Sequence, residues 1–355
     1  MYAPPRFQAN SPFYNDLKSR VASHFNQKNE NFTGNIRLYG KAMFLVTTLV
    51  VCWVSIIFLS PPLLWSLCLW SLMAFATAGI GFNVMHDGSH GSFSENKFLN
   101  TMAAFSLNVL GGDARMWKQK HTVMHHTFTN VLGHDDDIEV QPFMRMCEQQ
   151  KRYSLHRFQH IYFVALYCIL YILWVFLFDF RKYFRGKIGK TPLPTMTTSQ
   201  HFEFWGYKLL NLILFVIIPI YTLGFSNFIV GYLLFMVITG FTISIIFQLA
   251  HTVEDTHFPS AAENNRMETD WATHQVMTTA NFATQSRFMA WFAGGLNFQI
   301  EHHLFPHISH IHYPAIHKIV KQTCLEYGIK YVEYPTVAHA VVSHVKFLKQ
   351  MGTKD

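Results

Sequence analysis

A cluster of histidines near the C-terminal end of the chain is the first feature that could do chemistry. The stretch NFQIEHHLFPHISHIH, residues 297–312, contains five histidines and one glutamate. Gln299, His302 and His303 are spaced i, i+3 and i+4, so they share one face if the stretch is helical. Neutral imidazole is the commonest metal ligand among protein side chains. The spacing predicts that His302 and His303 bind metal, with Gln299 where a third histidine would complete the set.

Two earlier stretches repeat this spacing. In HDGSH, His86 and His90 are four residues apart, and in HTVMHH the same is true of His121 and His125. Each pair can direct both rings at one ion from one helical face. On an α-helix His126 is turned about 100° from its neighbour, toward a second ion or a second direction on the first. The alternatives are a cap beside a loop histidine for the first pair, and a solvated basic face for the second.

Further polar residues could support these clusters. HDDDIEV offers Asp135, Asp136 and Asp137, which could accept N–H bonds from ligand imidazoles, and Asp137 is a candidate as a ligand or as a partner of one. A solvated acidic loop is the alternative, and the sequence does not rank the three. His251 ends the last long apolar stretch, where its ring could join the ligands, although a single histidine at a helix end is more often a cap. We expect His307, His310 and His312, which lie beyond Pro306, to be surface or capping residues, and His274 to have a structural role rather than to bind metal.

Together the clusters indicate metal binding. Eight neutral imidazoles exceed the capacity of one tetrahedral zinc, so two ions are implied, and nitrogen-rich sites suit iron, zinc or copper. A soluble carboxylate-bridged di-iron bundle would need two Glu-x-x-His pairs. Only Glu254 and His257 have that spacing, which disfavours this architecture.

The composition is that of a membrane protein. Of 355 residues, 50% are hydrophobic and only 14% are charged, whereas about a quarter are charged in a soluble domain. The five cysteines show no C-x-x-C spacing, so neither a disulfide framework nor a thiolate metal site is indicated. The net charge of +7 comes from basic residues scattered beside apolar stretches. This pattern favours cytoplasmic anchoring over nucleic-acid binding.

The apolar stretches predict an all-α integral membrane protein with four transmembrane helices, because about twenty apolar residues cross a bilayer. The predicted spans are residues 42–59, 63–83, 208–223 and 228–249. Basic residues precede the first span and are missing from both hairpin tips, which places the tips away from the cytoplasm. Residues 161–178 have basic residues at both ends, so we expect them to lie in the interface.

This topology puts the histidine clusters on the cytoplasmic side. Residues 41–330 then form one membrane domain with a cytoplasmic helical cap, between a cytoplasmic N-terminal segment, 1–40, and a cytoplasmic C-terminal tail, 331–355. No internal repeat or second domain is indicated.

In these clusters the sequence closely resembles the membrane fatty acid desaturases, whose signature is three histidine boxes. The boxes here are HDGSH from His86, HTVMHH from His121 and QIEHH from Gln299. Gln in the first position of the third box is typical of front-end desaturases of the delta-5 and delta-6 type. These enzymes insert a double bond between an existing one and the carboxyl end. The resemblance implies four spanning helices with a cytoplasmic cap that holds a histidine-ligated di-iron site.

Carried over residue by residue, the resemblance implies eight iron ligands: His86, His90, His121, His125, His126, His251, His302 and His303. Gln299 replaces the remaining histidine, and either direct or water-mediated binding of its amide is open. Phe247 lies one turn before His251, where family members that act on saturated chains can carry an asparagine.

The resemblance also implies an oxygen-dependent desaturase that introduces a cis double bond into a long-chain, already unsaturated acyl chain. A di-iron membrane hydroxylase or ketolase of lipids is an alternative, against which Gln299 argues. A histidine-rich metal transporter is another, but it would place ionisable groups inside the spans, and the apolar stretches are nearly free of them. The sequence does not reveal which carbon is attacked, or whether coenzyme A, a carrier protein or a glycerolipid carries the chain.

We expect a separate protein to deliver electrons. Many front-end desaturases carry a fused cytochrome b5 domain with a His-Pro-Gly-Gly motif, and this sequence has no such motif. An acidic ferredoxin is the first choice and free cytochrome b5 the second, each with its reductase, because basic residues near the cap attract an acidic partner. The other expected partners are an acyl-lipid or acyl-CoA substrate and membrane lipids. The expected location is a bacterial inner membrane, with the active site on the cytoplasmic face.

Overall fold

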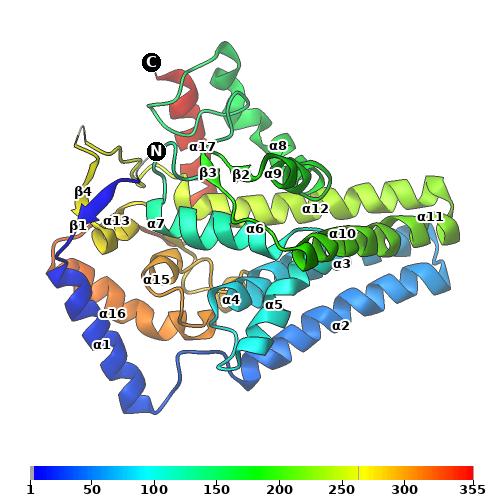
Figure 1. The fold of residues 1–355 in the computed structure, drawn as a ribbon, viewed down its shortest axis with the longest axis horizontal. Helices are drawn as coiled ribbons and strands as arrows, with labels where there is room; N and C mark the ends of the chain where they lie inside the picture. The colour runs from blue at the N-terminus through cyan, green and yellow to red at the C-terminus, as the bar shows by residue number, and fades with distance from the viewer. Residues whose placement is uncertain (1–3, 263, 355) are drawn as a thin grey trace. The chain divides into compact units, whose positions relative to one another are not determined.

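The computed structural model describes residues 4–262 and 264–354, most of which are helical (Figure 1). The α-helices are α1 Pro12–Lys28, α2 Ile36–Leu59, α3 Leu63–Ile80, α4 His86–His90, α5 Lys97–Val109, α6 Ala114–Lys118, α7 His126–Phe128, α8 Gln159–Leu173, α9 Asp179–Arg185, α10 Thr198–Leu212, α11 Ile218–Leu223, α12 Phe225–His251, α13 Trp271–Met277, α14 Arg287–Phe292, α15 Gln299–Leu304, α16 Tyr313–Glu326 and α17 Val337–Thr353.

Other short elements join or extend these helices. The π-helical turns are η1 Gly81–Met85, η2 Gln119–His125, η4 Trp174–Phe178 and η5 Ile213–Ile217, and the 3₁₀ turns are η3 Ser154–Phe158 and η6 His310–His312. The strands are β1 Arg6–Gln8, β2 Lys187–Ile188, β3 Thr191–Pro192, β4 Arg266–Asp270, β5 Asn281–Phe282 and β6 Glu333–Tyr334. They form two-stranded sheets, parallel for β1 with β4 and for β5 with β6, and antiparallel for β2 with β3.

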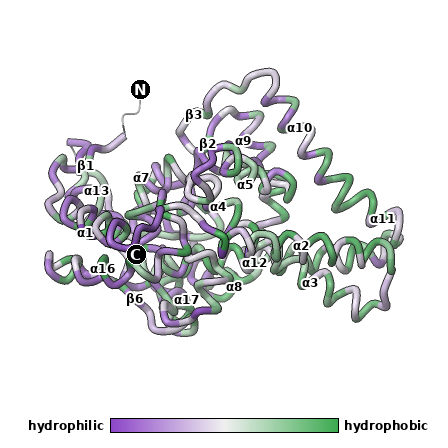
Figure 2. Tube along the Cα trace, turned by 90° about the horizontal axis from the view of Figure 1, so that it is seen from below, coloured by the Kyte–Doolittle hydropathy of each residue, from purple (hydrophilic) through white to green (hydrophobic). Residues whose placement is uncertain are grey.

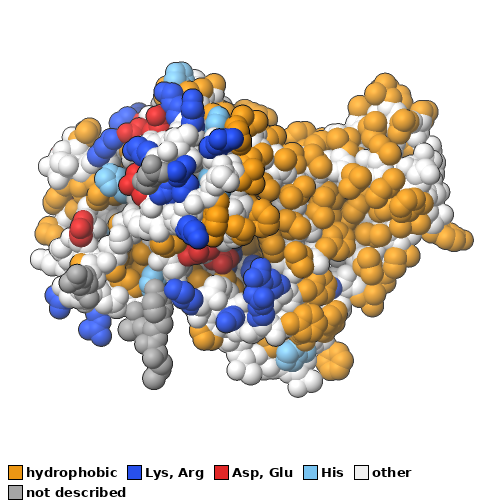
Figure 3. All heavy atoms as spheres, turned by 90° about the horizontal axis from the view of Figure 1, so that it is seen from above, with side chains coloured by type: hydrophobic (Ala, Val, Ile, Leu, Met, Phe, Trp, Pro, Cys, Tyr) orange, Lys and Arg blue, Asp and Glu red, His pale blue; other side chains and the backbone are white. Residues whose placement is uncertain are grey.

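Within the described residues, five helices are long and apolar enough to cross a membrane: Ile36–Leu59, Leu63–His90, Ser154–Arg185, Thr198–Leu223 and Phe225–His251. Hydrophobic residues dominate α2, α3 and α11 in Figure 2, and hydrophobic side chains cover a broad area of the face in Figure 3. The all-α membrane architecture expected from the sequence is therefore supported.

The number of spans differs from the prediction. Each of the four predicted spans lies inside one of these helices, but the stretch predicted to lie in the interface, residues 161–178, is part of the 32-residue helix Ser154–Arg185. The apolar residues 161–178 are only part of this helix. The helix is long enough to cross a membrane because it continues through the polar residues on both sides of them. The four-span count is not confirmed, and the interfacial position of residues 161–178 stays a prediction.

The chain divides into two compact units. Unit 1 contains the described residues of Met1–Thr33, Gln119–Phe163 and Ile246–Asp355, and unit 2 contains Gly34–Lys118 and Val164–Ile245. In unit 2, α2 and α3 form a helical hairpin in close contact, since a Cβ added at Gly79 would lie 2.9 Å from Leu45. Asn35 caps α2 by accepting a hydrogen bond from the backbone N–H of Arg37.

In unit 1, α1, α13, α15 and α16 enclose a core of aromatic and aliphatic side chains. Phe13, Leu17 and Phe298 are among its buried members. The C-terminal residues belong to this unit as well, because β6 pairs with β5 and α17 buries Phe347 and Leu348. The segment predicted as a tail is therefore folded, whereas the boundary at residue 330 stays a prediction.

Candidate metal centre

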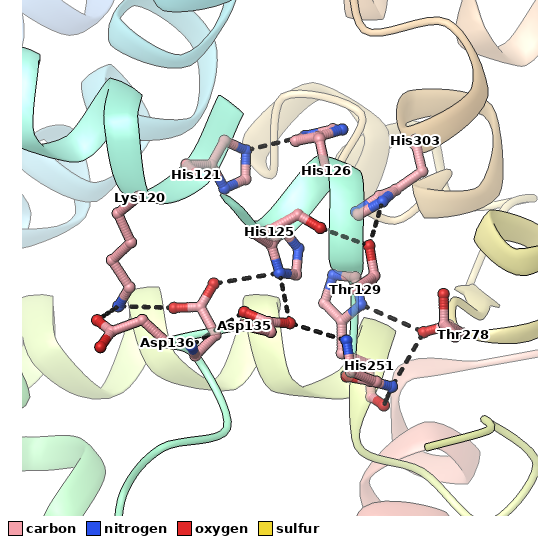
Figure 4. Close-up of polar contacts among 12 residues, drawn as sticks. Lys120, His121, His125, His126, Thr129, Asp135, Asp136, His251, Thr278 and His303 are labelled. Carbon is pink, nitrogen blue, oxygen red and sulfur yellow. Dashed lines mark hydrogen bonds and ion pairs between the residues drawn. The ribbon is translucent and has the colours of Figure 1, made fainter. Parts of the chain in front are cut away.

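The second histidine box forms a π-helical turn. η2 ends at His125 and α7 begins at His126. Hydrogen bonds in a π-helix join residues i and i+5, so His126 comes back over His121, and their Nε2 atoms lie 3.2 Å apart (Figure 4). The sequence did not predict the π-helical turn. His126 belongs to a different candidate group from His121 and His125, together with His302 and His303, and the second direction expected for its ring stays a prediction. All three rings of this box lie close together, with centroids 4.7–5.8 Å apart.

The third box lies on α15, whose residues are all buried. This confirms that Gln299, His302 and His303 are on one short helix. Glu301 has its carboxylate bound by the Asn281 amide at 2.7 Å and by the Tyr331 hydroxyl at 2.6 Å. Asn281 in turn accepts a hydrogen bond from the backbone N–H of Ile300. This fully satisfied buried carboxylate fixes α15 in place.

Unit 1 brings six of the predicted histidines together with Asp137. In each of three groups the candidate ligand atoms lie within 4.8 Å of one another. The groups are His125 with His251 and His303, His126 with His302 and His303, and His121 with His125 and Asp137. His303 belongs to two groups and His125 to two, so the groups overlap. His251 lies beside the boxes, in the position where the sequence allowed its ring to join them.

Four of these rings are oriented in the same way, with Nδ1 held by a polar partner. Nδ1 of His125 donates to Asp135 at 2.9 Å, that of His251 to the Thr278 carbonyl at 3.4 Å, and that of His303 to Gln275 Oε1 at 2.8 Å, while Nδ1 of His302 lies 3.1 Å from the Tyr313 hydroxyl. A neutral imidazole with its proton on Nδ1 presents a lone pair on Nε2. Partners of this kind typically fix the tautomer of metal-binding histidines.

Asp135 is the buried carboxylate of the acidic stretch. It also accepts a hydrogen bond from the backbone N–H of Asn130 at 2.8 Å. Burial by itself lowers the pKa of His125, but Asp135, with a smaller contribution from Asp137, outweighs burial and the pKa is raised. The Nε2 atom of His125 is buried without a hydrogen-bond partner among the described residues. An imidazole made more basic, with its free nitrogen directed into a cluster of rings, is suited to hold a cation.

Asp136 is more exposed and lies near Lys120 (Figure 4). Asp137 is also more exposed and contacts Lys120. Asp137 lies 2.7 Å from Lys120 and 3.3 Å from Nδ1 of His125. Burial by itself would raise the pKa of the Asp137 carboxyl, but Lys120 and His125 outweigh it and the pKa is lowered. The structure therefore separates the three carboxylates that the sequence could not rank.

His303 lies in the most imidazole-rich surroundings. Burial and then the neighbouring histidines, among them His126 and His251, lower its pKa well below the usual value. The ring is therefore neutral, as a metal ligand must be. The Thr129 hydroxyl donates a 2.9 Å hydrogen bond to Oε1 of Gln275, the partner of His303.

Gln299 is fully buried between two of these histidines. Its amide nitrogen lies 2.9 Å from Nε2 of His251 and 3.3 Å from Nε2 of His303. Its Oε1 has no hydrogen-bond partner among the residues that the structure describes. The amide group therefore faces the same ring nitrogens that would face an ion.

The first box lies in unit 2 and is described by itself. His86 and His90 are on α4, as their spacing predicted, with ring centroids 4.7 Å apart. Trp117 lies edge-on to both rings, at 5.7 Å from His86 and 6.4 Å from His90. The two imidazoles form a pair that can direct nitrogen atoms at one ion.

The other histidines stand outside the candidate groups found among the described residues. His307 is exposed, His312 is the N-cap residue of α16, and His310 and His274 are buried. Burial lowers the pKa of His274 to about 4. His307 and His312 agree with the expected surface and capping positions, whereas His310, expected at the surface or at a cap, is buried.

Sequence reasoning missed the residues that orient the ligands. Gln275, Thr278 and Tyr313 belong to α13, the turn after it and the start of α16. No spacing links them to the boxes, because their contacts arise only from tertiary packing. Gln275 is next to His274, and the nearness of the third box to α13 could not be read from the chain.

The clustered, buried imidazoles of this protein with long apolar helices could hold a metal ion. The sequence model of the fatty acid desaturase family matches residues 60–335. The acyl-lipid (8-3)-desaturase of Physcomitrium patens is 37% identical over 347 residues, which cover 97% of this chain and 72% of that protein. The sn-1 linoleoyl-lipid 6-desaturase of Synechocystis sp. is 34% identical over 353 residues, covering 98% and 97%. The protein of the same description from Arthrospira platensis is 31% identical, covering 96% and 92%.

The chain therefore belongs to the fatty acid desaturase family. It is an oxidoreductase that forms double bonds in fatty acyl chains, and the resemblance found in the three boxes is confirmed.

Proposed function

We propose that this desaturase is a front-end enzyme that acts on an already unsaturated acyl chain of a membrane lipid and forms a cis double bond on the carboxyl side. The observation that carries the proposal is Gln299, buried beside His251 and His303. Two of the relatives are named linoleoyl-lipid 6-desaturases and another an acyl-lipid (8-3)-desaturase. These names support a lipid-bound, unsaturated substrate.

The proposed cofactor is a pair of iron ions held by the seven box histidines together with His251. These eight residues are His86, His90, His121, His125, His126, His251, His302 and His303. These ligands fit iron, because imidazole nitrogens suit this metal. In addition, Nε2 of His125 is buried and has no hydrogen-bond partner among the described residues, so its lone pair is available to a metal. We assign Gln299 as a further ligand through its amide oxygen, and Asp137 as a partner of His125. Rotation of the Gln299 amide brings the oxygen to the place of its nitrogen.

When bound, the irons supply the oxidising power, from dioxygen and two electrons, that removes two hydrogens from neighbouring methylene groups. The side chains of the protein prepare the site for this chemistry. Asp135, Gln275 and the Thr278 carbonyl keep the protons of three ligands on Nδ1. The complete burial of His302 and His303 excludes water from their side of the site. The position of the acyl chain relative to the buried helix α15 then selects the two neighbouring carbons that lose hydrogen.

Expression in a host fed defined polyunsaturated fatty acids tests the function. We expect new double bonds on the carboxyl side of an existing one, in lipids extracted from the host. The membrane hydroxylase or ketolase alternative predicts products that retain oxygen, which mass spectrometry distinguishes from alkenes. If only saturated chains are converted, the front-end assignment is wrong.

The proposed topology has four spans, with residues 161–178 in the interface and the metal centre on the cytoplasmic face of a bacterial inner membrane. Basic residues at both ends of the helix Ser154–Arg185 support it. In a cysteine-free background, impermeant thiol reagents should reach exposed Ser60→Cys and Ser226→Cys from outside, and should miss Ser154→Cys and Lys187→Cys. Labelling that puts residues 154 and 187 on opposite sides would show five spans.

The proposed electron donor is a separate acidic protein, a ferredoxin or free cytochrome b5, with its reductase. Purified protein with substrate and dioxygen should be inert. Adding ferredoxin, ferredoxin reductase and NADPH should start turnover that weakens as salt rises, because screening shortens the reach of charge attraction. Sustained turnover without a protein donor, or turnover indifferent to ionic strength, would contradict this proposal.

A further inference from the structure

The C-terminal end of α5 in unit 2 is held by side chains from two other helices. The carbonyl of its last residue, Val109, accepts a hydrogen bond from Asn211 at 2.9 Å. The next two carbonyls also accept, that of Leu110 from the Tyr171 hydroxyl and that of Gly111 from Lys208 Nζ at 2.6 Å. The end of a helix leaves such carbonyls unsatisfied, and hydrocarbon offers no water to replace a partner.

Lys208 is the charged member of this set. It lies on α10 with 8% of its surface exposed, and its Nζ is 3.0 Å from Oδ2 of Asp179, which is 1% exposed. A buried ion pair is costly, because both charges give up their hydration. The ammonium also faces the negative end of the α5 dipole.

The backbone at this point depends on close contact. Gly111 has φ +97°, and a Cβ there would lie 3.0 Å from Val175 and 3.1 Å from Asn211. The positive φ favours glycine. The turn after α5 is therefore pressed against η4 and α10, with the Lys208 ammonium as its polar anchor.

This turn leads directly to the ring that lies beside the first box. The Asn108 side chain accepts from the backbone N–H of Ala114, and Asp113 accepts from that of Met116. These two bonds start α6, which carries Trp117, the side chain edge-on to His86 and His90. In addition, α5 packs closely against α4. A Cβ added at Gly88 would lie only 2.6 Å from Ala103.

We propose that Lys208, paired with Asp179, is a positioning residue for the first histidine box. Its bond to Gly111 fixes the turn between α5 and α6 and thereby holds Trp117 against His86 and His90. The inference rests on the proposed function, in which those two histidines bind iron.

The test separates charge balance from positioning. Lys208→Met alone leaves the Asp179 carboxylate buried and uncompensated, which is strongly destabilising, whereas removing both charges is often tolerated. The Lys208→Met/Asp179→Leu double variant should therefore be extracted in normal yield and lose less thermal stability than Lys208→Met alone, although it leaves the Gly111 carbonyl and the Trp174 N–H without these partners. It should still lose about 10-fold or more in metal affinity, the loss typical of residues that orient ligands. Titration of the metal-free protein with Fe²⁺ or Co²⁺, followed by absorption spectra, measures this loss.

Lys182→Met is the matched control. The Nζ of Lys182 lies 3.9 Å from Oδ1 of the same Asp179, but Lys182 is on α9 and not on α10. The variant therefore removes a cation near Asp179 without removing the bond to Gly111. We expect wild-type metal affinity and spectra for this variant. A double variant with wild-type affinity and spectra would overturn the inference, as would an equal loss in Lys182→Met.

Two further variants make the result decisive. If the double variant does not fold, Trp117→Leu replaces it, and unchanged metal affinity in Trp117→Leu overturns the inference. His86→Ala distinguishes the two proposals. If His86→Ala binds metal like the wild type, the proposed ligand set fails. If His86→Ala loses metal but the Lys208 and Trp117 variants do not, only the positioning role fails.

Discussion

Replacing His303 with alanine should abolish desaturation and lower the metal content of the purified protein. His303 is the ring shared by two of the three ligand groups in unit 1, so its loss removes a nitrogen from both. The loss of turnover should exceed about 100-fold, the upper end of what residues behind the ligands contribute. Metal analysis of the gently purified wild type should give about two irons per chain, because eight imidazoles exceed the needs of one ion.

The control for this prediction is His307→Ala. His307 lies four residues further along the same stretch but is exposed, so its variant should keep wild-type activity and metal. His303→Ala should still reach the membrane in normal amount, since α15 is outside the helices that could span it. Substantial activity in His303→Ala, or a wild type that holds a single zinc, would show that the ligand assignment is wrong.

The chemistry of the site could be predicted from spacing, because i, i+3 and i+4 residues share a helical face in any context. This local rule placed His86 with His90 and Gln299 with His303. It did not predict that Nε2 of His126 lies 3.2 Å from Nε2 of His121, because an i+4 rule assumes α-helical hydrogen bonds and η2 is π-helical. A switch from i+4 to i+5 hydrogen bonding depends on packing around the turn, and no residue type in HTVMHH predicts this switch.

Contacts between distant segments were beyond the sequence for a different reason. Asp135, Asp136 and Asp137 are chemically identical, and only the fold buries Asp135 against His125 and leaves the other two beside Lys120. The same holds for Gln275, which is 28 residues from the ring that it orients. In the membrane helices, apolar length was readable, but the extension of residues 161–178 into a 32-residue helix was not. The polar residues on both sides of this stretch gave no indication that the helix continues through them.

Replacing Asp135 with asparagine should weaken metal binding by about 10–100-fold, the range found for partners of ligand histidines. The carboxylate accepts from three groups: Nδ1 of His125, the backbone N–H of Asn130 and that of Asp137. Asparagine has nearly the same shape but only one acceptor oxygen. In Asp135, Oδ1 accepts from Asp137, whereas Oδ2 accepts from both His125 and Asn130. If the asparagine oxygen takes the Oδ1 position, the amide N–H₂ faces His125 Nδ1.

The His125 ring would then have to accept at Nδ1 and carry its proton on Nε2, the nitrogen needed for the metal. The loss should therefore appear in the affinity of the metal-free variant for Fe²⁺ or Co²⁺, with little change in thermal unfolding. Asp136→Asn is the matched control, because its carboxylate contacts Lys120 at 3.4 Å and we expect its variant to bind metal like the wild type. Equal affinities in the two variants would mean that Asp135 does not set the tautomer of His125, and that the site is organised by the ligands alone.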